Sequence, residues 1–390
     1  MNAFDLLLDQ WSAQVKEIFP TLHAYQQKTL ALCVQGILQS GNAVMQRVAE
    51  AVWEYSMSDT KMVSHERRFQ RFISNERIDV ESCWNQFLQQ VLPFWQEKTV
   101  TLVLDLTPYT TETTIVYVGI LVHSRVLPLC WCLMPQQEQW DREQWDIVAQ
   151  LFEQMAPFFT SDRCTLIADR GLSSLTLITL CQKVGWHYLL RIKNEEHFRR
   201  KFRHWHRDWQ AGTSLIRKEG DHWYGKILLW QEHEWECWLS ACWEAGYEEA
   251  WFLISDQKAS HKRVNDYAQR MKVEATFQDQ KSRGCMIECS RFTNRDHLNR
   301  WLFVVFLSMW WGAHLGSSCV HHGHRDEVDR TDRREKGLLR IGRLWLKAIL
   351  KKANRALFHR EKLGRIKAQL ANCLLFSHRQ KRLFFSIYIQ

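Results

Sequence analysis

The sequence predicts a mixed α/β protein with helical regions at both ends, and three observations support this. Residues 99–193 alternate between β-branched apolar runs and amphipathic runs, in the order three strands, helix, strand, helix, strand. Residues 1–95 show the apolar spacing of helices, and residues 319–390 add a large excess of Lys and Arg to that spacing. A chain of 390 residues is long enough for two or three domains.

The central runs predict the core. Residues 99–132 contain three strand-like runs that favour an antiparallel meander, and two helices and two further strands follow. This order is that of the ribonuclease-H-like fold, so we expect a core of that kind. The expected segments are VTLVLDL, TTIVYVGILV, RVLPLCWCLM, DREQWDIVAQLFEQMAPFF, CTLIADR, LSSLTLITLCQKV and WHYLLRIKN.

Two of these strands carry an acid at or near the end. Asp105 lies in the first strand, and Asp169 closes the fourth. A carboxylate in such a place is costly to bury unless it is paired or bound to a metal. In the ribonuclease-H-like fold the acids converge from neighbouring strands, and a later helix supplies the third.

A sparse, ordered run supplies a candidate for that helix: Tyr267-x2-Arg270-x3-Glu274-x6-Lys281. Residues at these offsets return to within about 60° of one direction on an α-helix. We therefore expect a phenol, a guanidinium, a carboxylate and an ammonium along one helical face. A metal-binding oxygen flanked by phosphate-binding cations suits phosphoryl transfer on a polyanion.

Asp105, Asp169 and Glu274 form a typical oxygen-ligand set for Mg²⁺ or Mn²⁺. With the run around Glu274, this set resembles the DDE transposases of the IS4 family, which are marked by a Y-x2-R-x3-E-x6-K signature. All four signature positions are present at that spacing. The resemblance extends from about His65 to about Trp311.

The resemblance implies a two-metal-ion enzyme with Mg²⁺ (or Mn²⁺) in the active site. Asp105 would bridge the two ions, and Asp169 and Glu274 would each complete the coordination of one. The implied reaction is cut-and-paste transposition: cleavage at terminal inverted repeats, a DNA hairpin at each end, and joining of the 3′-OH ends to target DNA. A homodimer would hold the two ends of the double-stranded DNA.

The same resemblance implies that Tyr267, Arg270 and Lys281 bind DNA phosphates beside the scissile bond. Trp251 opens a strand just before the signature run. In relatives that form a hairpin, a Trp in this strand stacks beside a flipped base, because aromatic stacking compensates for lost base stacking. Arg170 is a further candidate for a phosphate contact, and a salt bridge to a neighbouring carboxylate is the equally open alternative.

The predicted organisation has four parts. Residues 1–95 form a helical DNA-binding region, in which Arg67, Arg68, Arg71 and Arg77 decorate a short helix and its end; a packing subdomain with a basic face is the alternative. Residues 96–193 and 256–318 form the catalytic core, and residues 194–255 form a Trp-rich β insertion. Residues 319–390 form a basic helical region that contacts DNA, a partner subunit or both.

Charge and cysteine content indicate the class of binding partner and the cellular compartment. Between Lys336 and Arg382 there are 14 basic residues and one acid, which favours a nucleic-acid partner. The 12 Cys include no C-x2-C pair, which fits reduced thiols in a cytoplasmic, nucleoid-associated protein. The apolar run 301–315 is too short to span a bilayer, so we expect a core helix and no membrane partner.

Three other classes of protein are alternatives to a transposase. One is a ribonuclease-H-like metal nuclease without strand transfer, and another is a domesticated DNA-binding protein without catalysis. A structural zinc protein is the third, prompted by Cys130-x-Cys132 and by His321-His322-Gly323-His324. Neither cluster has the spacing of a structural zinc site with a matching second half.

Overall fold

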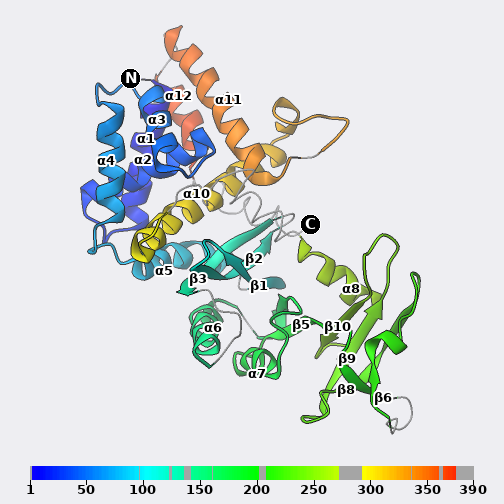
Figure 1. Cartoon of the computed structure of the whole chain (residues 1–390). Helices are drawn as coiled ribbons and strands as arrows, with labels where there is room; N and C mark the ends of the chain where they lie inside the picture. The colour runs from blue at the N-terminus through cyan, green and yellow to red at the C-terminus, as the bar shows by residue number, and fades with distance from the viewer. Residues whose placement is uncertain are drawn as a thin grey trace. The chain divides into compact units, whose positions relative to one another are not determined.

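The structure is a computed structural model that divides into two compact units (Figure 1). One unit comprises residues 1–94, 122–127 and 275–390, and the other comprises residues 95–121 and 128–274. The four-part division expected from the sequence stays a prediction. The residues that the structure describes are 2–95, 97–122, 125–135, 142–159, 161–201, 208–271, 292–334, 336–359 and 363–374.

The first unit is helical. Two of its helices begin at capping acceptors: the Asn2 side chain accepts from the Asp5 amide at the start of α1, and the Asp79 side chain accepts from the Ser82 amide at the start of α5. The helices expected within residues 1–95 are confirmed. The helices are α1 (Ala3–Ile18), α2 (Ala24–Ser40), α3 (Met45–Tyr55), α4 (Met62–Ile73), α5 (Val80–Val91), α10 (Arg295–His321), α11 (Leu338–Phe358) and α12 (Leu363–Ala371), with short 3-10 turns at Leu92–Trp95 and Arg325–Glu327.

Helix α10 is the core of this unit. It contacts α2, α4, α5 and α11, and its Trp311 ring stacks on Trp11 of α1 with the centroids 4.4 Å apart. Among the described residues, α10 is the one helix long and apolar enough to cross a membrane, but 94% of its apolar window is buried inside the protein. The expectation of a core helix over residues 301–315 is therefore confirmed.

Glycines bring α10 and α11 close together. A Cβ on Gly316 would lie 2.0 Å from the Leu338 carbonyl oxygen, and a Cβ on Gly342 would lie 2.0 Å from the Gly312 oxygen. Helix α10 continues to His321, and it stays buried as far as Cys319.

The second unit is built on a sheet. The three strands, helix, strand, helix and strand expected from the sequence are confirmed. The elements are β1 (Val100–Pro108), β2 (Thr113–Val122), β3 (Arg125–Pro135), α6 (Arg142–Met155), β4 (Cys164–Ala168), α7 (Leu175–Lys183), β5 (His187–Ile192), β6 (His197–Lys201), β7 (Gln210–Ala211), β8 (His222–Leu229), β9 (Trp235–Cys242), β10 (Trp251–Ser255) and α8 (His261–Ala268), with 3-10 turns at Ala156–Phe158, Ser161–Arg163 and Gly212–Ser214.

Within the described residues, these strands form one sheet in the order β3-β2-β1-β4-β5-β10-β9-β8-β6-β7. Strand β1 pairs antiparallel with β2 and parallel with β4, and β4 pairs parallel with β5. Strand β10 then joins β5 to β9 by antiparallel pairing. The strands of residues 194–255 therefore extend the same sheet as β1, β4 and β5.

Candidate active site

Two carboxylates come together where the pairing of β1 with β4 stops. The last register pair of these parallel strands joins Leu104 to Ala168, and Asp105 and Asp169 are the next residues on each chain. Neighbouring strands lie about 4.8 Å apart, so the parallel register places the two acids side by side. The Asp105 side chain is 13% exposed and that of Asp169 is 36% exposed.

Each of these carboxylates accepts a backbone amide. Oδ1 of Asp105 accepts from the Leu106 amide, and Oδ1 of Asp169 accepts from the Arg170 amide, both at 2.8 Å. These local hydrogen bonds restrict the orientation of both side chains. They leave Oδ2 of each residue directed at a common neighbour.

That neighbour is Arg270. Its Nη2 lies 3.1 Å from Oδ2 of Asp105 and 3.4 Å from Oδ2 of Asp169. Two adjacent carboxylates repel each other, and a cation between them offsets that repulsion. With a side chain only 10% exposed, the guanidinium supplies this charge in a partly desolvated place.

Arg270 reaches the acids from a turn. Helix α8 ends at Ala268, because the Gln269 amide bonds to the Asp266 oxygen and the Arg270 amide bonds to the Tyr267 oxygen at 2.7 Å. Such three-residue spacings tighten the end of a helix. The single helical face expected for Tyr267 and Arg270 is therefore wrong for the described residues, although both side chains reach Asp169.

Tyr267 is a buried neutral phenol beside Asp169. Its hydroxyl donates to Oδ1 of Asp169 at 3.4 Å, and its side chain is 1% exposed. Burial raises the pKa of Tyr267, the Asp169 charge raises it further, and Arg270 and Arg191 oppose this rise. The phenol stays protonated at neutral pH and acts as a hydrogen-bond donor.

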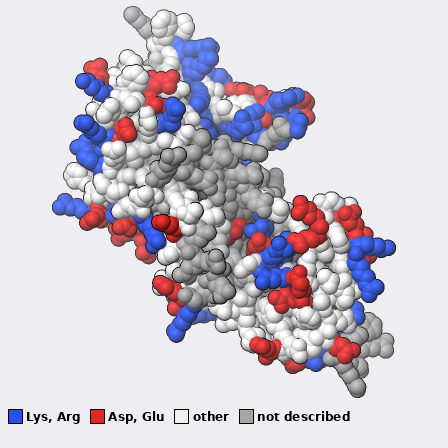
Figure 2. All heavy atoms as spheres, viewed as in Figure 1, with Lys and Arg blue, Asp and Glu red and all other residues white. Residues whose placement is uncertain are grey.

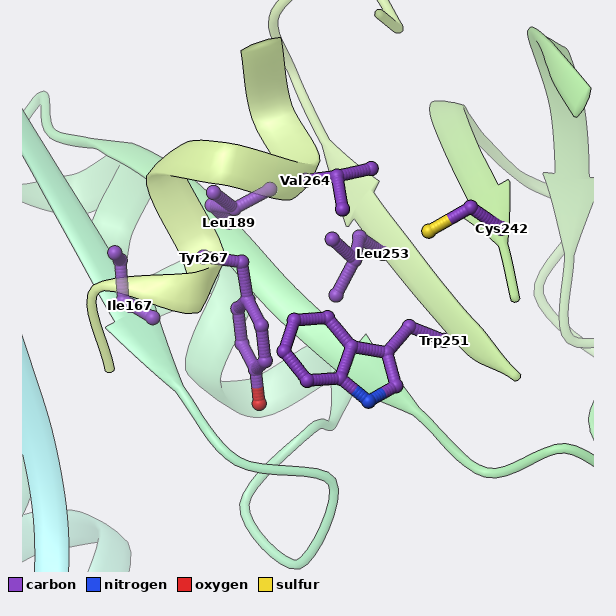
Figure 3. Packing of buried hydrophobic residues seen from close by; sticks show 7 residues of the cluster. All are labelled: Ile167, Leu189, Cys242, Trp251, Leu253, Val264 and Tyr267. Atoms are coloured by element: carbon purple, nitrogen blue, oxygen red, sulfur yellow. The ribbon is translucent and has the colours of Figure 1, made fainter. Parts of the chain in front are cut away.

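Trp251 packs against Tyr267 (Figure 3). The two rings meet edge to face, with centroids 5.3 Å apart, and Tyr247 stacks on Trp251 at 4.4 Å. Trp251 is 7% exposed, and its expected contact with a flipped base stays a prediction. The surrounding cluster consists of Ile167, Leu189, Cys242, Trp251, Leu253, Val264 and Tyr267.

Arg170 takes part in a second ionic cluster. Its Nη1 lies 2.8 Å from Oε1 of Glu249, so the salt bridge considered from the sequence is present. The same Oε1 accepts from Nη2 of Arg191 at 2.6 Å, and Oε2 of Glu249 accepts from Nδ2 of Asn194 at 3.1 Å.

Arg191, Asn194 and Glu249 were missed by sequence reasoning. The strand order gives a signal for Arg191, because it follows Leu190, which pairs with Ala168 immediately before the second acid. Glu249 has no comparable signal, since its contacts depend on the pairing of β10 with β5 across a long stretch of chain.

The described donors fit a hard divalent cation. Carboxylate oxygens are the ligands that Mg²⁺ and Mn²⁺ prefer, and Asp105 and Asp169 supply them side by side. Glu274, the expected third ligand, and Lys281 both lie outside the described residues. Within the described part of the chain, no group of three or more His, Cys, Asp or Glu is arranged to hold a metal ion.

The chain matches a family model of known proteins. Residues 118–311, just under half of the length, match the model for the transposase DDE domain. The matched segment contains Asp169, Trp251, Tyr267 and Arg270, and it begins after Asp105. No curated protein matches the chain. The family match indicates a transposase-type enzyme that acts on DNA.

Proposed function

We propose that this chain is a DDE transposase of the IS4 type, which cleaves transposon ends and joins them to target DNA. The observation that carries the proposal is the adjacency of Asp105 and Asp169 on parallel strands, with Arg270 between them. The match of residues 118–311 to a transposase DDE domain supports the same reaction class.

The sheet supports a ribonuclease-H-like core. The order β3-β2-β1-β4-β5, with β2 antiparallel to β1 and with β1, β4 and β5 parallel, is the order expected of that fold. Its two described acids lie side by side on adjacent strands, Asp105 within β1 and Asp169 directly after β4. In this proposal residues 194–255 are an insertion into the core, between Asp169 and Glu274.

The proposed cofactor is Mg²⁺ (or Mn²⁺), with two ions per active site. Asp105, Asp169 and Glu274 would hold it. When bound, it supplies the charge that activates water and stabilises the leaving 3′ oxygen. The carboxylates would fix the position of the ions. The amides of Leu106 and Arg170 hold the carboxylates of Asp105 and Asp169 in place.

The remaining side chains position the DNA. Arg270 offers a planar fork that suits a phosphate, and Tyr267 donates a hydroxyl from a fixed, buried ring. Lys281 adds a point charge, and Trp251 stacks on an extruded base during hairpin formation. Arg170 is a further phosphate contact, which it can make when it leaves Glu249.

The helical unit supplies the longer-range DNA contacts. Figure 2 shows Lys and Arg gathered over the part of this unit where Figure 1 draws α11, whose exposed positions include Arg340, Lys351 and Arg355. The opposite side of α11 is buried against α10. We propose that this exposed face follows a phosphate backbone. The arginines of residues 67–77 contact transposon ends in this proposal. A homodimer joins two such ends in a cytoplasmic, nucleoid-associated complex.

The test uses the DNA that flanks the chain's own gene, end-labelled and incubated with the protein in Mg²⁺ or in EDTA. We expect cleavage at short inverted repeats in Mg²⁺, followed by joining of the 3′-OH ends to a second DNA. Cleavage without joining would favour a metal nuclease. Binding without cleavage would favour a non-catalytic DNA-binding protein.

A further inference from the structure

The loop between β9 and β10, residues 243–250, contributes two side chains to the candidate active site. Tyr247 stacks on the Trp251 ring with centroids 4.4 Å apart and an interplanar angle of 27°. Glu249 pairs with both Arg170 and Arg191. Glu248, between them in the sequence, is exposed. An aromatic ring and an acid two residues apart therefore face the site together.

A defined turn presents these side chains. The Tyr247 amide bonds to the Glu244 oxygen at 3.1 Å, and Gly246 between them has a φ of 85°. A positive φ at the third position of a four-residue turn favours Gly. The indole of Trp243 also donates to the Tyr247 oxygen at 3.0 Å. The loop is held by its own hydrogen bonds, so the position of Tyr247 is set locally.

Glu249 occupies a set of donors that also suits a phosphate. Two guanidinium groups and one amide donate to its two oxygens at 2.6–3.1 Å. Guanidinium groups bind carboxylates and phosphates through the same geometry. Within the described part of the chain, the buried Nε of Arg191 has no hydrogen-bond partner, so this guanidinium can serve a further acceptor oxygen.

The stacking face and the donor set adjoin each other. The Arg191 guanidinium carbon lies 5.6 Å from the centroid of the Trp251 ring. The same guanidinium therefore contacts both the Trp251 ring and Glu249. A nucleotide likewise carries a flat ring and a phosphate joined by a short linker. Tyr247 and Glu249 thus lie where a base and its phosphate would be expected.

We propose that residues 243–250 are an internal nucleotide mimic, in which Tyr247 covers the stacking face of Trp251 and Glu249 fills an adjoining phosphate site. A DNA strand enters this part of the site by displacing both side chains. This inference rests on the proposed function, because it takes a DNA strand as the ligand. It predicts that the loop selects for unpaired nucleotides, which alone have a free base to exchange for Tyr247.

The binding test uses a labelled duplex with one end unpaired by mismatches, and the same duplex fully paired, both in EDTA so that no cleavage occurs. Glu249→Gln should bind the frayed duplex about fivefold more tightly than Glu248→Gln, since the competing ion pairs are lost while the change in net charge is equal. Tyr247→Ala should also bind more tightly, whereas Tyr247→Phe keeps the ring and should behave as wild type.

Hydrogen exchange of the full chain gives a second readout that a merely structural role of Glu249 would not change. The frayed duplex should speed exchange at the amides of residues 243–250 while it slows exchange around Trp251. Equal affinities of Glu249→Gln and Glu248→Gln, or slower exchange in the loop on binding, would overturn the inference and leave the proposed function standing. Failure of every variant and of wild type to bind either duplex would overturn both.

Discussion

The guanidinium of Arg270 donates to the carboxylate of Asp105, with Nη2 and Oδ2 3.1 Å apart, and the same nitrogen lies 3.4 Å from Asp169. Without the metal, this arginine is the cation that separates two adjacent acids. The stability of the sheet-containing unit therefore depends on how the negative charges of Asp105 and Asp169 are balanced.

Replacing Arg270 with Ala should destabilise the protein in EDTA by about 2–4 kcal/mol, because two partly buried carboxylates then face each other without a cation. Mg²⁺ should restore part of that loss. Thermal unfolding with and without Mg²⁺ measures both effects. Arg263→Ala is the control, since Arg263 is also partly buried but pairs with Asp266 on α8. An equal response of both variants to Mg²⁺ would contradict the proposed role of Arg270.

Two substitutions of Tyr267 distinguish the effect of its packing from the effect of its hydrogen bond. Tyr267→Phe keeps the ring against Trp251 and removes the hydroxyl that lies 3.4 Å from Asp169. We expect DNA cleavage to fall about tenfold, with a change in unfolding free energy of less than about 1 kcal/mol. Tyr267→Ala should cost about 3–5 kcal/mol, because it leaves a cavity. Wild-type cleavage by Tyr267→Phe would show that the hydroxyl has no part in the reaction.

Alkaline pH should weaken the cluster around Trp251. Burial, followed by the charge of Glu244, raises the pKa of the Cys242 thiol from 9.0 to about 11. Since the folded pKa lies above the unfolded one, the stability from this thiol is complete below pH 9 and is lost as pH rises towards 11. The loss is about 1.4 kcal/mol per pH unit.

Denaturant unfolding of wild type and Cys242→Ala across this range tests the effect. The difference in stability between the two proteins should shrink or reverse as pH rises, because the variant lacks this titration. A constant difference from pH 8 to pH 11 would show that the thiol ionises in the folded protein as readily as in the unfolded chain.

The basic face of α11 should control the salt dependence of DNA binding. Truncation before Lys336 would also remove buried residues such as Leu346, so point substitutions are the cleaner test. Lys351→Gln should lower the slope of log K against log salt by about 0.9, as expected for one lost phosphate contact. Lys352→Gln should change it less, because its ammonium is already paired with Glu327 at 2.7 Å. Equal slopes for Lys351→Gln and wild type would remove this face from the DNA interface.

The succession of strands and helices along residues 99–193 and the two strand-borne acids could be predicted because they depend on local pattern. Apolar runs of β-branched residues give strands. The ribonuclease-H-like order of those strands led us to expect that Asp105 and Asp169 lie on neighbouring strands, and β1 and β4 do pair. Tyr267 and Arg270, which contact these acids, could also be identified from the sequence, because they stand at the spacing of the signature.

The rest depends on tertiary contacts that local pattern does not encode. The end of α8 at Ala268 is set by turn hydrogen bonds, and the close approach of α10 to α11 depends on glycine contacts between them. Glu249 meets Arg191 only because β10 pairs with β5. Burial of Trp251 under Tyr247 likewise requires the loop before β10, which carries no motif.

The central claim is that Asp105 and Asp169 form the metal-dependent centre that cleaves DNA. The most direct measurement compares Mg²⁺-dependent cleavage of the gene's flanking DNA by wild type, Asp105→Ala, Asp169→Ala and Glu274→Ala, with DNA binding measured in parallel. Asp162→Ala serves as control, because Asp162 is an exposed acid of the same unit. We predict that the three variants bind the DNA but do not cleave it, while the control does both. Full cleavage by any of the three would contradict the account.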